Sequence, residues 1–388
     1  MTKVLYQFSY TYKYFRMGVF CYYECMDINN PFETFERYAF RLEALPEYIV
    51  SEEIESLKHF QETGLTHNSG SEWAELVSNN INTGKKMERL RLLSEHLTDY
   101  ERYELQAYSG PEAGEHIHVA LKKEYLEEYL YDFWFFDDKW IAQVNYEEDG
   151  TFINFDVRSA TQAEIHAYTY WHSIYENAEQ LRQVPFVANT VDDTHCLQAA
   201  YMSAAKYFDP GFDIPMEEWS AITGYEEGLG TWANAGLVWF KENGYDVKHY
   251  ELFDFEEFIR RPKEYMIEVN GEEAGKWGFE HTNVPVEIER MKKLVASGIA
   301  EKRRPSIEDI KHFIDDGYLV RVTINCGTLD GTHEYIGHAV IITSYNNTYI
   351  QFHDPGLPPI PNRQATYEDF EAAWSDQEKE LDAIKLIG

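Results

Sequence analysis

Residues 192–208, "DDTHCLQAAYMSAAKYF", place a cysteine at the point where a helix is expected to begin. After Cys196, small and aromatic residues recur at the spacing of one buried helical face: Ala199, Ala200, Ser203, Ala204 and Tyr207. Asp193 and Thr194 are both good N-cap residues, so the helix is expected to start within one or two residues of the thiol. The pattern predicts a cysteine at the electropositive end of a buried helix.

Residues 337–355, "GHAVIITSYNNTYIQFHDP", read as a β-hairpin that carries a histidine and an aspartate. If Ser344 pairs with Thr348, then Ile342 faces Ile350, Val340 faces Phe352 and His338 faces Asp354. This register puts the imidazole and the carboxylate on one face, whereas a two-residue turn at Asn346 and Asn347 would place them on opposite faces. We therefore predict a three-residue loop, Tyr345-Asn346-Asn347, with one asparagine in the left-handed conformation.

A thiol, an imidazole and a carboxylate together are the parts of an activated cysteine nucleophile. Taken singly, a cysteine at a helix start or a His–Asp pair at a strand end is more often structural. A helix N-terminus and a nearby imidazolium act locally, while diffuse surface carboxylates are screened beyond about 8 Å. We therefore expect the pKa of Cys196 to lie below that of a free thiol.

Four segments of residues 184–388 resemble a known family when their order and spacing are taken together. They are "VPFVANTVDDTHCLQAA" (184–200), "GTWANAGLVWFKENGYDV" (230–247), "SIEDIKHFIDDGYLVRVTI" (306–324) and "GHAVIITSYNNTYIQFHDPG" (337–356). This half of the chain resembles the bacteriocin-processing-type cysteine peptidases of the papain-like superfamily, in particular the free-standing branch without a transporter.

The resemblance implies an α+β, papain-like fold in which a nucleophile helix packs on an antiparallel sheet. It also implies a Cys–His–Asp triad made of Cys196, His338 and Asp354, which hydrolyses a peptide or amide bond through an acyl-thioester. Asn189 stands in the region where the family places the glutamine that donates to the oxyanion, and Leu197 stands where the family commonly has glycine. The resemblance implies neither a cofactor nor a metal.

Three other interpretations stay open. An amine could capture the same thioester, which would make the protein a transamidase or acyltransferase. The missing glutamine favours a catalytically inactive peptide-binding module, whereas the complete Cys, His and Asp set opposes it. Zinc binding by a set drawn from His195, Cys196, His333, His338 and His353 is the weakest, because strand residues five apart face opposite sides. Gln198 is a poorer oxyanion donor than Asn189, and Cys326 is expected to be a small buried residue.

The sequence pattern of residues 1–183 predicts a separate α+β domain, and this part of the sequence contains no recognisable chemical motif. Val4 to Tyr14 alternate as in a strand, and residues 139–157 predict a hairpin around Asp149-Gly150. Helical patterns are expected around residues 31–43, 51–62, 71–79, 85–107, 122–131 and 160–182. In the second domain, residues 184–388, Ser306 and Asp309 fit a capping box and Gly317 fits a helix C-cap.

The composition limits the partners of this chain. Its 388 residues carry a formal net charge of −34 that is spread over both halves, so nucleic acids and anionic membranes are poor partners. The expected partner is a peptide or protein substrate, and the first domain is a candidate surface for a partner protein. Four unpaired-looking cysteines and an N-terminus without an apolar segment predict a cytoplasmic protein.

One basic segment interrupts the acidic chain at residues 289–305, "ERMKKLVASGIAEKRRP". A solvated face paired with neighbouring carboxylates is the simpler interpretation. The sharper hypothesis is that its basic side chains guide an acidic peptide toward the cleft: Lys292, Lys293, Lys302, Arg303 and Arg304.

Overall fold

The structure is a computed structural model that describes residues 31–50, 53–66, 72–108, 114–123, 125, 127–332, 335–374 and 379–387. The chain divides into two compact units. Unit 1 comprises residues 1–61 and 66–181, and unit 2 comprises residues 62–65 and 182–388. The expected strand at residues 4–14, together with Cys21 and Cys25, lies outside the described residues. Each unit has a mixture of helices and one large sheet, so the chain is of the α+β type.

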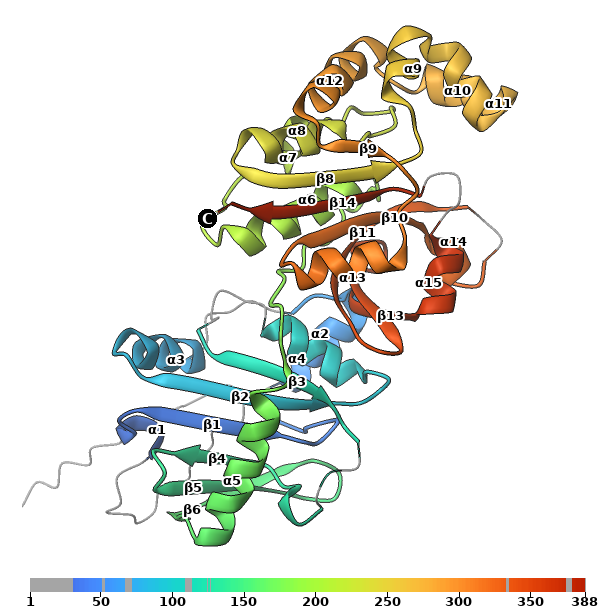
Figure 1. Ribbon diagram of the computed structural model, residues 1–388. Helices are drawn as coiled ribbons and strands as arrows, with labels where there is room; N and C mark the ends of the chain where they lie inside the picture. The colour runs from blue at the N-terminus through green and yellow to red at the C-terminus, as the bar shows by residue number, and fades with distance from the viewer. Residues whose placement is uncertain are drawn as a thin grey trace, which may run out of the picture. The chain divides into compact units, whose positions relative to one another are not determined.

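Unit 1 is built around a mixed sheet whose order, in the described residues, is β6-β5-β4-β1-β2-β3-β7 (Figure 1). Strands β1, β2 and β3 are parallel to one another, and the remaining neighbours are antiparallel. The strands are β1 (Tyr38–Glu43), β2 (Lys86–Leu93), β3 (His116–Leu121), β4 (Phe133–Phe136), β5 (Trp140–Tyr146), β6 (Phe152–Ser159) and β7 (Glu179–Gln180). The helices are α1 (Pro31–Thr34), α2 (Ile54–Thr63), α3 (Glu72–Asn82), α4 (Asp99–Ala107), the 3-10 turn η1 (Glu127–Tyr129) and α5 (Gln162–Tyr175).

The hairpin predicted around Asp149-Gly150 is confirmed as β5 and β6, with Gly150 at a φ of +89°. The helices expected over residues 31–43 and 85–107 are wrong in part, because β1 and β2 occupy much of these ranges. Among the described residues of 122–131, the helical ones are those of the short turn η1. In β2, the fully buried Arg91 bonds Glu104, and Arg89 bonds Glu115. Charged residues normally lie on a solvated face, so the sequence of β2 resembles the exposed side of a helix. The burial of Arg89 and Arg91 is therefore the reason that the helix prediction fails here.

Unit 2 contains a second sheet, whose order in the described residues is β13-β12-β11-β10-β14-β8-β9. All neighbouring strands are antiparallel except β8 and β9. The strands are β8 (Tyr245–Glu251), β9 (Ala300–Lys302), β10 (Leu319–Asn325), β11 (Gly337–Tyr345), β12 (Tyr349–Asp354), β13 (Ile360–Thr366) and β14 (Leu381–Leu386). The helices are α6 (Cys196–Phe208), α7 (Met216–Ile222), α8 (Asn234–Glu242), α9 (Phe255–Arg260), α10 (Pro262–Asn270), α11 (Glu272–Glu280), α12 (Val284–Ser297), α13 (Ile307–Asp315), α14 (Cys326–Leu329) and α15 (Tyr367–Ala373).

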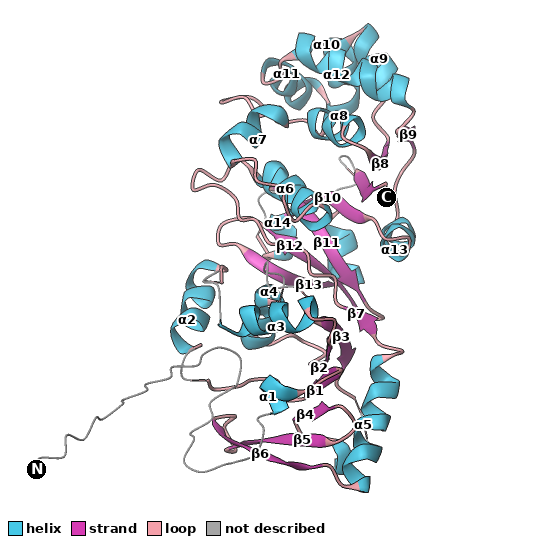
Figure 2. Ribbon diagram, turned by 90° about the vertical axis from the view of Figure 1, so that its left-hand side faces the viewer, coloured by secondary structure: helices cyan, strands magenta, loops and turns pink. Residues whose placement is uncertain are grey.

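Helices cover both faces of the sheet of unit 2 (Figure 2). On one face, α6 packs Ala200 and Ala204 against a core that includes Ile341. On the other face, α13 and α15 pack against a core that includes Val340 and Ile342. Because successive strand residues point to opposite faces, β11 is buried on both sides. This double burial holds the strand that carries His338 in a defined place beneath α6.

The ends of α13 follow the predicted signals. Ser306 accepts a hydrogen bond from the backbone of Asp309, whose side chain accepts one from the backbone of Ser306. Gly317 follows the helix with a φ of +85°, a conformation that glycine adopts without strain. The predicted capping box and C-terminal glycine are therefore confirmed.

The predicted register of the hairpin formed by β11 and β12 is wrong by two residues. Ile342 pairs with Phe352, and after a β-bulge at Thr343 the pairing continues as Ser344 with Gln351. The bulge adds one residue to β11, so it reverses the parity that the turn would otherwise impose. His338 and Asp354 therefore still share a face, but they lie diagonally and not directly opposite.

The predicted left-handed asparagine in this hairpin is also wrong. Neither Asn346 nor Asn347 has a positive φ. Instead, the side-chain oxygen of Asn346 accepts hydrogen bonds from the backbone N–H groups of Thr348 and Tyr349. An Asx-type turn thus replaces the left-handed residue that we expected.

Candidate active site

Cys196 is the first residue of α6, as predicted, but the capping differs from expectation. The N-cap position is His195, and no side chain caps the helix. Asp193 has a φ of +58° in the loop before it. Neither Asp193 nor Thr194 accepts a hydrogen bond from the first N–H groups of the helix. These donors therefore stay available near the sulfur, and the N–H of Leu197 helps to lower the pKa of Cys196.

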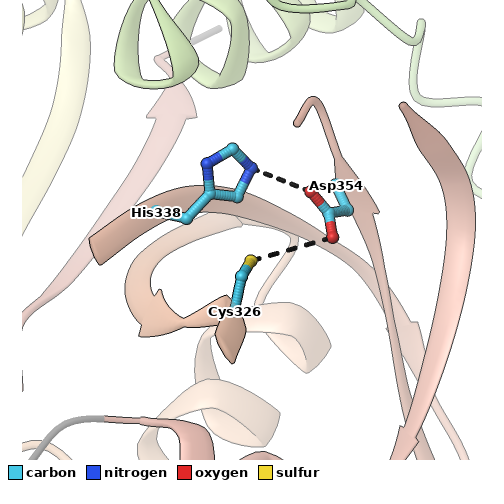
Figure 3. A group of neighbouring side chains, drawn as sticks. All are labelled: Cys326, His338 and Asp354. Carbon is cyan, nitrogen blue, oxygen red and sulfur yellow. Dashed lines mark hydrogen bonds and ion pairs between the residues drawn. The ribbon is translucent and has the colours of Figure 1, made fainter. Parts of the chain in front are cut away.

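His338 and Asp354 lie beside each other at the ends of β11 and β12 (Figure 3). The Nε2 atom of His338 is 2.8 Å from Oδ1 of Asp354, and both side chains are less than one-tenth exposed. The pair is close enough for an ion pair, but it is not aligned as a linear hydrogen bond. With Nε2 on the carboxylate, Nδ1 is the ring nitrogen left for a second partner.

The thiol of Cys196 and the imidazole of His338 change each other's pKa. Burial alone would raise the pKa of the thiol, but the hydrogen bond and charge of His338, with backbone N–H groups of Ala339 and Leu197, lower it below its usual 9.0. Burial would lower the pKa of His338, but Asp354 and Cys196 outweigh it and raise the pKa to about 10. Both shifts favour a thiolate–imidazolium pair at neutral pH.

Arg363, on β13, is a neighbour of the candidate site that the sequence reasoning missed. Its Nη1 atom donates to Oδ2 of Asp354 at 2.7 Å, and its Nη2 atom donates to Asp330 at 2.6 Å. Burial would raise the pKa of Asp354, but His338 first and then Arg363 hold it below its usual 3.8. The only sequence signal was a basic residue nine positions after the aspartate, in a strand that pairs with β12.

Asn189, the predicted oxyanion donor, is buried in the loop that leads to α6. Its side-chain oxygen accepts from the backbone N–H groups of Thr190 and His195, and its Nδ2 atom donates to Asp193 at 2.7 Å. The residue thus fixes the loop that leads into α6. An amide has two N–H donors, so one remains beyond the bond to Asp193.

Gln198 differs from Asn189 in its surroundings. Its side chain is fully buried in the first turn of α6, and neither polar atom has a hydrogen-bond partner. Nothing in the structure explains this unpaired amide.

Cys326 is buried, as predicted, but it lies unexpectedly close to the pair. Its Sγ atom is 3.9 Å from Oδ2 of Asp354 (Figure 3). Burial and the negative charge of Asp354 raise the pKa of Cys326 above its usual 9.0. Of the two described thiols, Cys196 is therefore the one whose surroundings favour the reactive thiolate.

The residues considered for zinc are largely held by other partners. His195 contacts Thr190 and Thr194, and both ring nitrogens of His353 have backbone partners. His333 lies outside the described residues. Donor atoms of Cys326, His338 and Asp354 lie within 4.8 Å of one another. The guanidinium of Arg363 already occupies Asp354 there, which opposes the binding of a cation.

Carboxylates neutralise the basic segment at residues 289–305. The pairs are Lys292 with Glu289, Lys293 with Glu242, Lys302 with Asp254 and Arg303 with Asp309. These contacts agree with the simpler interpretation, a solvated face paired with neighbouring carboxylates.

Comparisons with known proteins give a family model for part of the chain and a distant structural similarity. Residues 26–184 match a family model described as "Domain of unknown function (DUF6879)". No curated protein matches the chain. Among solved structures, it is similar to a Bacillus anthracis protein provisionally named a C39-like peptidase, with 13% identity and a TM-score of 0.27. That similarity covers 53% of this chain and 96% of the other, and a score this low establishes neither fold nor activity.

In the described part of the chain, no helix has both the length and the apolar character that crossing a bilayer requires.

The groups around the first residue of α6 together have a definite chemical capacity. They combine a thiol with a lowered pKa, an imidazole with a raised pKa and a carboxylate fixed by an arginine. These are the elements of nucleophilic attack with proton transfer.

Proposed function

We propose that this chain is a cysteine peptidase, or a closely related acyl-transfer hydrolase, with a papain-like second unit. Cys196 is the nucleophile, His338 the general base and acid, and Asp354 the residue that orients the imidazole. The observation that supports the proposal is that Nε2 of His338 lies 2.8 Å from Asp354 while His338 lowers the pKa of Cys196 and Cys196 raises that of His338. A thiol, an imidazole and a carboxylate in this order match the nucleophile, base and orienting group of an acyl-transfer site.

In the proposed reaction, the thiolate of Cys196 attacks the carbonyl carbon of a peptide or amide, and a carbon–sulfur bond forms. The carbonyl electrons move to oxygen and then return, which breaks the carbon–nitrogen bond while the imidazolium of His338 protonates the leaving amine. Neutral His338 next takes a proton from water, which attacks the thioester. The carbon–sulfur bond breaks, the acid leaves, and the thiolate–imidazolium pair forms again.

Two donors are proposed for the oxyanion. One is the backbone N–H of Cys196, and the other is the amide proton of Asn189 that is not given to Asp193. Loss of one such donor in an acyl-transfer enzyme costs on the order of a hundredfold or more in rate. The engagement of Asn189 with Asp193 is also the observation that favours the alternative function, a peptide-binding module without turnover.

Alkylation by iodoacetamide tests the nucleophile in the full chain. We expect Cys196 to react at pH 6.5 about tenfold faster in the wild type than in His338→Ala, because the imidazole lowers the thiol pKa. Cys326→Ser is the matched control, and it should leave the rate unchanged because the buried Cys326 has a raised pKa. Equal, slow alkylation of Cys196 in the wild type and in His338→Ala would contradict the proposal that Cys196 is an activated nucleophile.

Mass spectrometry of the full chain with a peptide library separates the reactions. A thioester adduct of Cys196 with cleaved peptides supports hydrolysis, and products joined to an added amine support acyl transfer. Bound peptides that return intact, with no adduct, would identify the binding module. Cys196→Ser is the control that should abolish both kinds of product.

A further inference from the structure

Gly356, two residues after Asp354, lies directly against the pair formed by His338 and Asp354. Its backbone N–H donates to Oδ1 of Asp354 at 3.1 Å, and this is the same oxygen that lies 2.8 Å from Nε2 of His338. A Cβ atom added to Gly356 would lie 3.1 Å from that oxygen, 3.2 Å from Nε2 and 3.3 Å from Cε1 of His338. The edge of the imidazole that is close to Asp354 is therefore also close to Gly356.

The neighbouring side chains, and not the backbone, explain why glycine stands here. Gly356 has no positive φ, so another residue could adopt its backbone conformation. Carbon atoms make favourable contacts from about 3.5 Å, so any side chain at this position would have to displace the imidazole or the carboxylate. The absence of a Cβ atom thus keeps a space free beside His338.

The imidazole is the group that a side chain at position 356 would displace. Arg363 holds the second oxygen of Asp354 at 2.7 Å, so the carboxylate is fixed from its other side. The carbonyl oxygen of Pro355 accepts a hydrogen bond from the N–H of Asn189 at 2.8 Å, which anchors the loop itself. With the carboxylate and the loop both held, the ring of His338 is left to move.

The space beside the ring matters because the imidazole and the carboxylate are close but not aligned. Nε2 of His338 lies 2.8 Å from Asp354, yet its direction does not make a hydrogen bond. A carboxylate stabilises the imidazolium of a nucleophile–base pair best when the ring N–H points at it. Alignment requires a small turn of the ring, and the edge that has to turn is the one beside Gly356.

We propose that Gly356 is a positioning residue of this site, which holds Asp354 through its backbone N–H and leaves His338 the room to align with the carboxylate. The inference rests on the proposed function, because the alignment matters for reactivity only if His338 acts on Cys196. Gly356 acts through His338 and needs no contact with a substrate. A side chain at position 356 should therefore slow the thiol even where the fold is intact.

The rate of alkylation of Cys196 by iodoacetamide, measured in the full chain from about pH 5 to about pH 9, tests this role. In Gly356→Ala the rate at pH 6 should fall about threefold and the midpoint of the pH curve should rise by about half a unit, because a displaced imidazole supports the thiolate less well. A loss of stability alone would lower the melting temperature but would not move this midpoint.

Gly230→Ala is the matched control for the substitution. Gly230 also has no positive φ, and in the described part of the chain the nearest atom to an added Cβ is the carbonyl oxygen of His281 at 3.6 Å, an ordinary contact. This variant should alkylate with the wild-type pH curve. If Gly230→Ala and Gly356→Ala shift the curve equally, the effect does not come from the space beside His338, and the proposal is overturned.

A double variant shows whether Gly356 acts through His338. In a His338→Ala background the ring is absent, so Gly356→Ala should leave the rate of alkylation unchanged. A further loss of about threefold in this background would overturn the proposal. If Gly356→Ala alone does not fold by circular dichroism, the double variant should fold because the clash is removed, and a double variant that also fails to fold would overturn the proposal.

The same measurements separate this inference from the proposed function. A wild-type thiol that reacts no faster than that of His338→Ala would overturn the proposed function, and the role of Gly356 with it. A fast wild-type thiol whose pH curve is unchanged in Gly356→Ala would overturn the role of Gly356 alone.

Discussion

At the scale of single residues, the electrostatics of the site depend on a short series of contacts from β13 to α6. Arg363 donates to one oxygen of Asp354, the other oxygen lies 2.8 Å from Nε2 of His338, and His338 lowers the pKa of Cys196. Each group keeps its neighbour in the charged form, because an opposite charge within a few ångströms favours ionisation. A change at either end of the series should therefore alter the reactivity of the thiol.

We predict that Arg363→Gln slows the alkylation of Cys196, and more strongly at pH 6 than at pH 8. Without the guanidinium the pKa of Asp354 rises, so the carboxylate takes up a proton first at low pH and holds the imidazolium less well. A loss of about tenfold at pH 6 corresponds to one unit in the pKa. Arg363→Lys keeps the positive charge, so its alkylation rate should fall less. If Arg363→Gln alkylates at the wild-type rate at both pH values, Arg363 does not influence the thiol through Asp354 and His338.

His353 predicts a separate dependence of stability on pH. Burial lowers the pKa of His353 from 6.5 to about 4. Its Nε2 atom donates to the backbone oxygen of Val184, and its Nδ1 atom accepts from the N–H of Asn362, so only the neutral ring satisfies both partners. The unfolded chain then binds the proton more tightly than the folded chain does. This contribution is present above pH 6.5 and is lost as the pH falls to 4.

Urea unfolding at pH 7 and pH 4.5 measures this effect. The free energy of unfolding should fall by about 3 kcal/mol as the pH falls from 6.5 to 4, since one pKa unit is about 1.4 kcal/mol. His353→Gln still offers a donor and an acceptor but does not titrate, so its stability should fall by less between the two pH values. The same decline in wild type and variant would show that His353 does not contribute.

At the scale of elements, the close approach of α8 to α6 sets the position of the helix that begins at Cys196. A Cβ atom added to Gly236 of α8 would come within 2.3 Å of the ring of Tyr201 on α6. Tyr201 in turn bonds Asp382 of β14 and accepts from Arg321 of β10. Glycine in this helix thus permits the packing that places Tyr201, and with it α6, on the sheet.

We predict that Gly236→Ala lowers the free energy of unfolding. The intrinsic gain of alanine over glycine in a helix is about 1 kcal/mol, whereas overpacking a buried contact costs typically 1–3 kcal/mol. The clash is with a ring that is itself anchored, so we expect a net loss of about 1 kcal/mol in urea unfolding. In a Tyr201→Ala background the loss should disappear; if it stays, the clash lies elsewhere.

At the scale of the whole molecule, each unit encloses its own core. Every described core cluster draws its residues from one unit, with those of unit 2 all lying after residue 183. The residues that contact Cys196, His338 and Asp354 also come from unit 2. A unit with its own core and a complete site should work without the rest of the chain.

We predict that residues 182–388 fold alone and keep the reactivity of Cys196. Alkylation by iodoacetamide should match the full chain within about twofold, and the His338→Ala version of the fragment is the control. A folded fragment with a slow thiol would mean that unit 1 contributes to the site. An unfolded fragment would show that unit 2 needs the first unit, or residues 62–65, for stability.

Much of unit 2 could be predicted from local patterns. The start of α6, the capping box of α13 and the strands around His338 follow from spacing and from residue types whose effects act within a few positions. The helices α9 to α12 between β8 and β9 were not anticipated in detail. In unit 1, local patterns predict a helix where β2 lies, since Arg89 and Arg91 are paired by carboxylates distant in sequence.

Short-range periodicity and capping chemistry thus sufficed to locate a helix-start cysteine and a hairpin that bears a histidine and an aspartate. The bulge at Thr343 and the arginine on Asp354 came from long-range packing. The reason is that caps and turns involve neighbours along the chain, whereas strand register and buried ion pairs depend on which distant segments the folded core brings together.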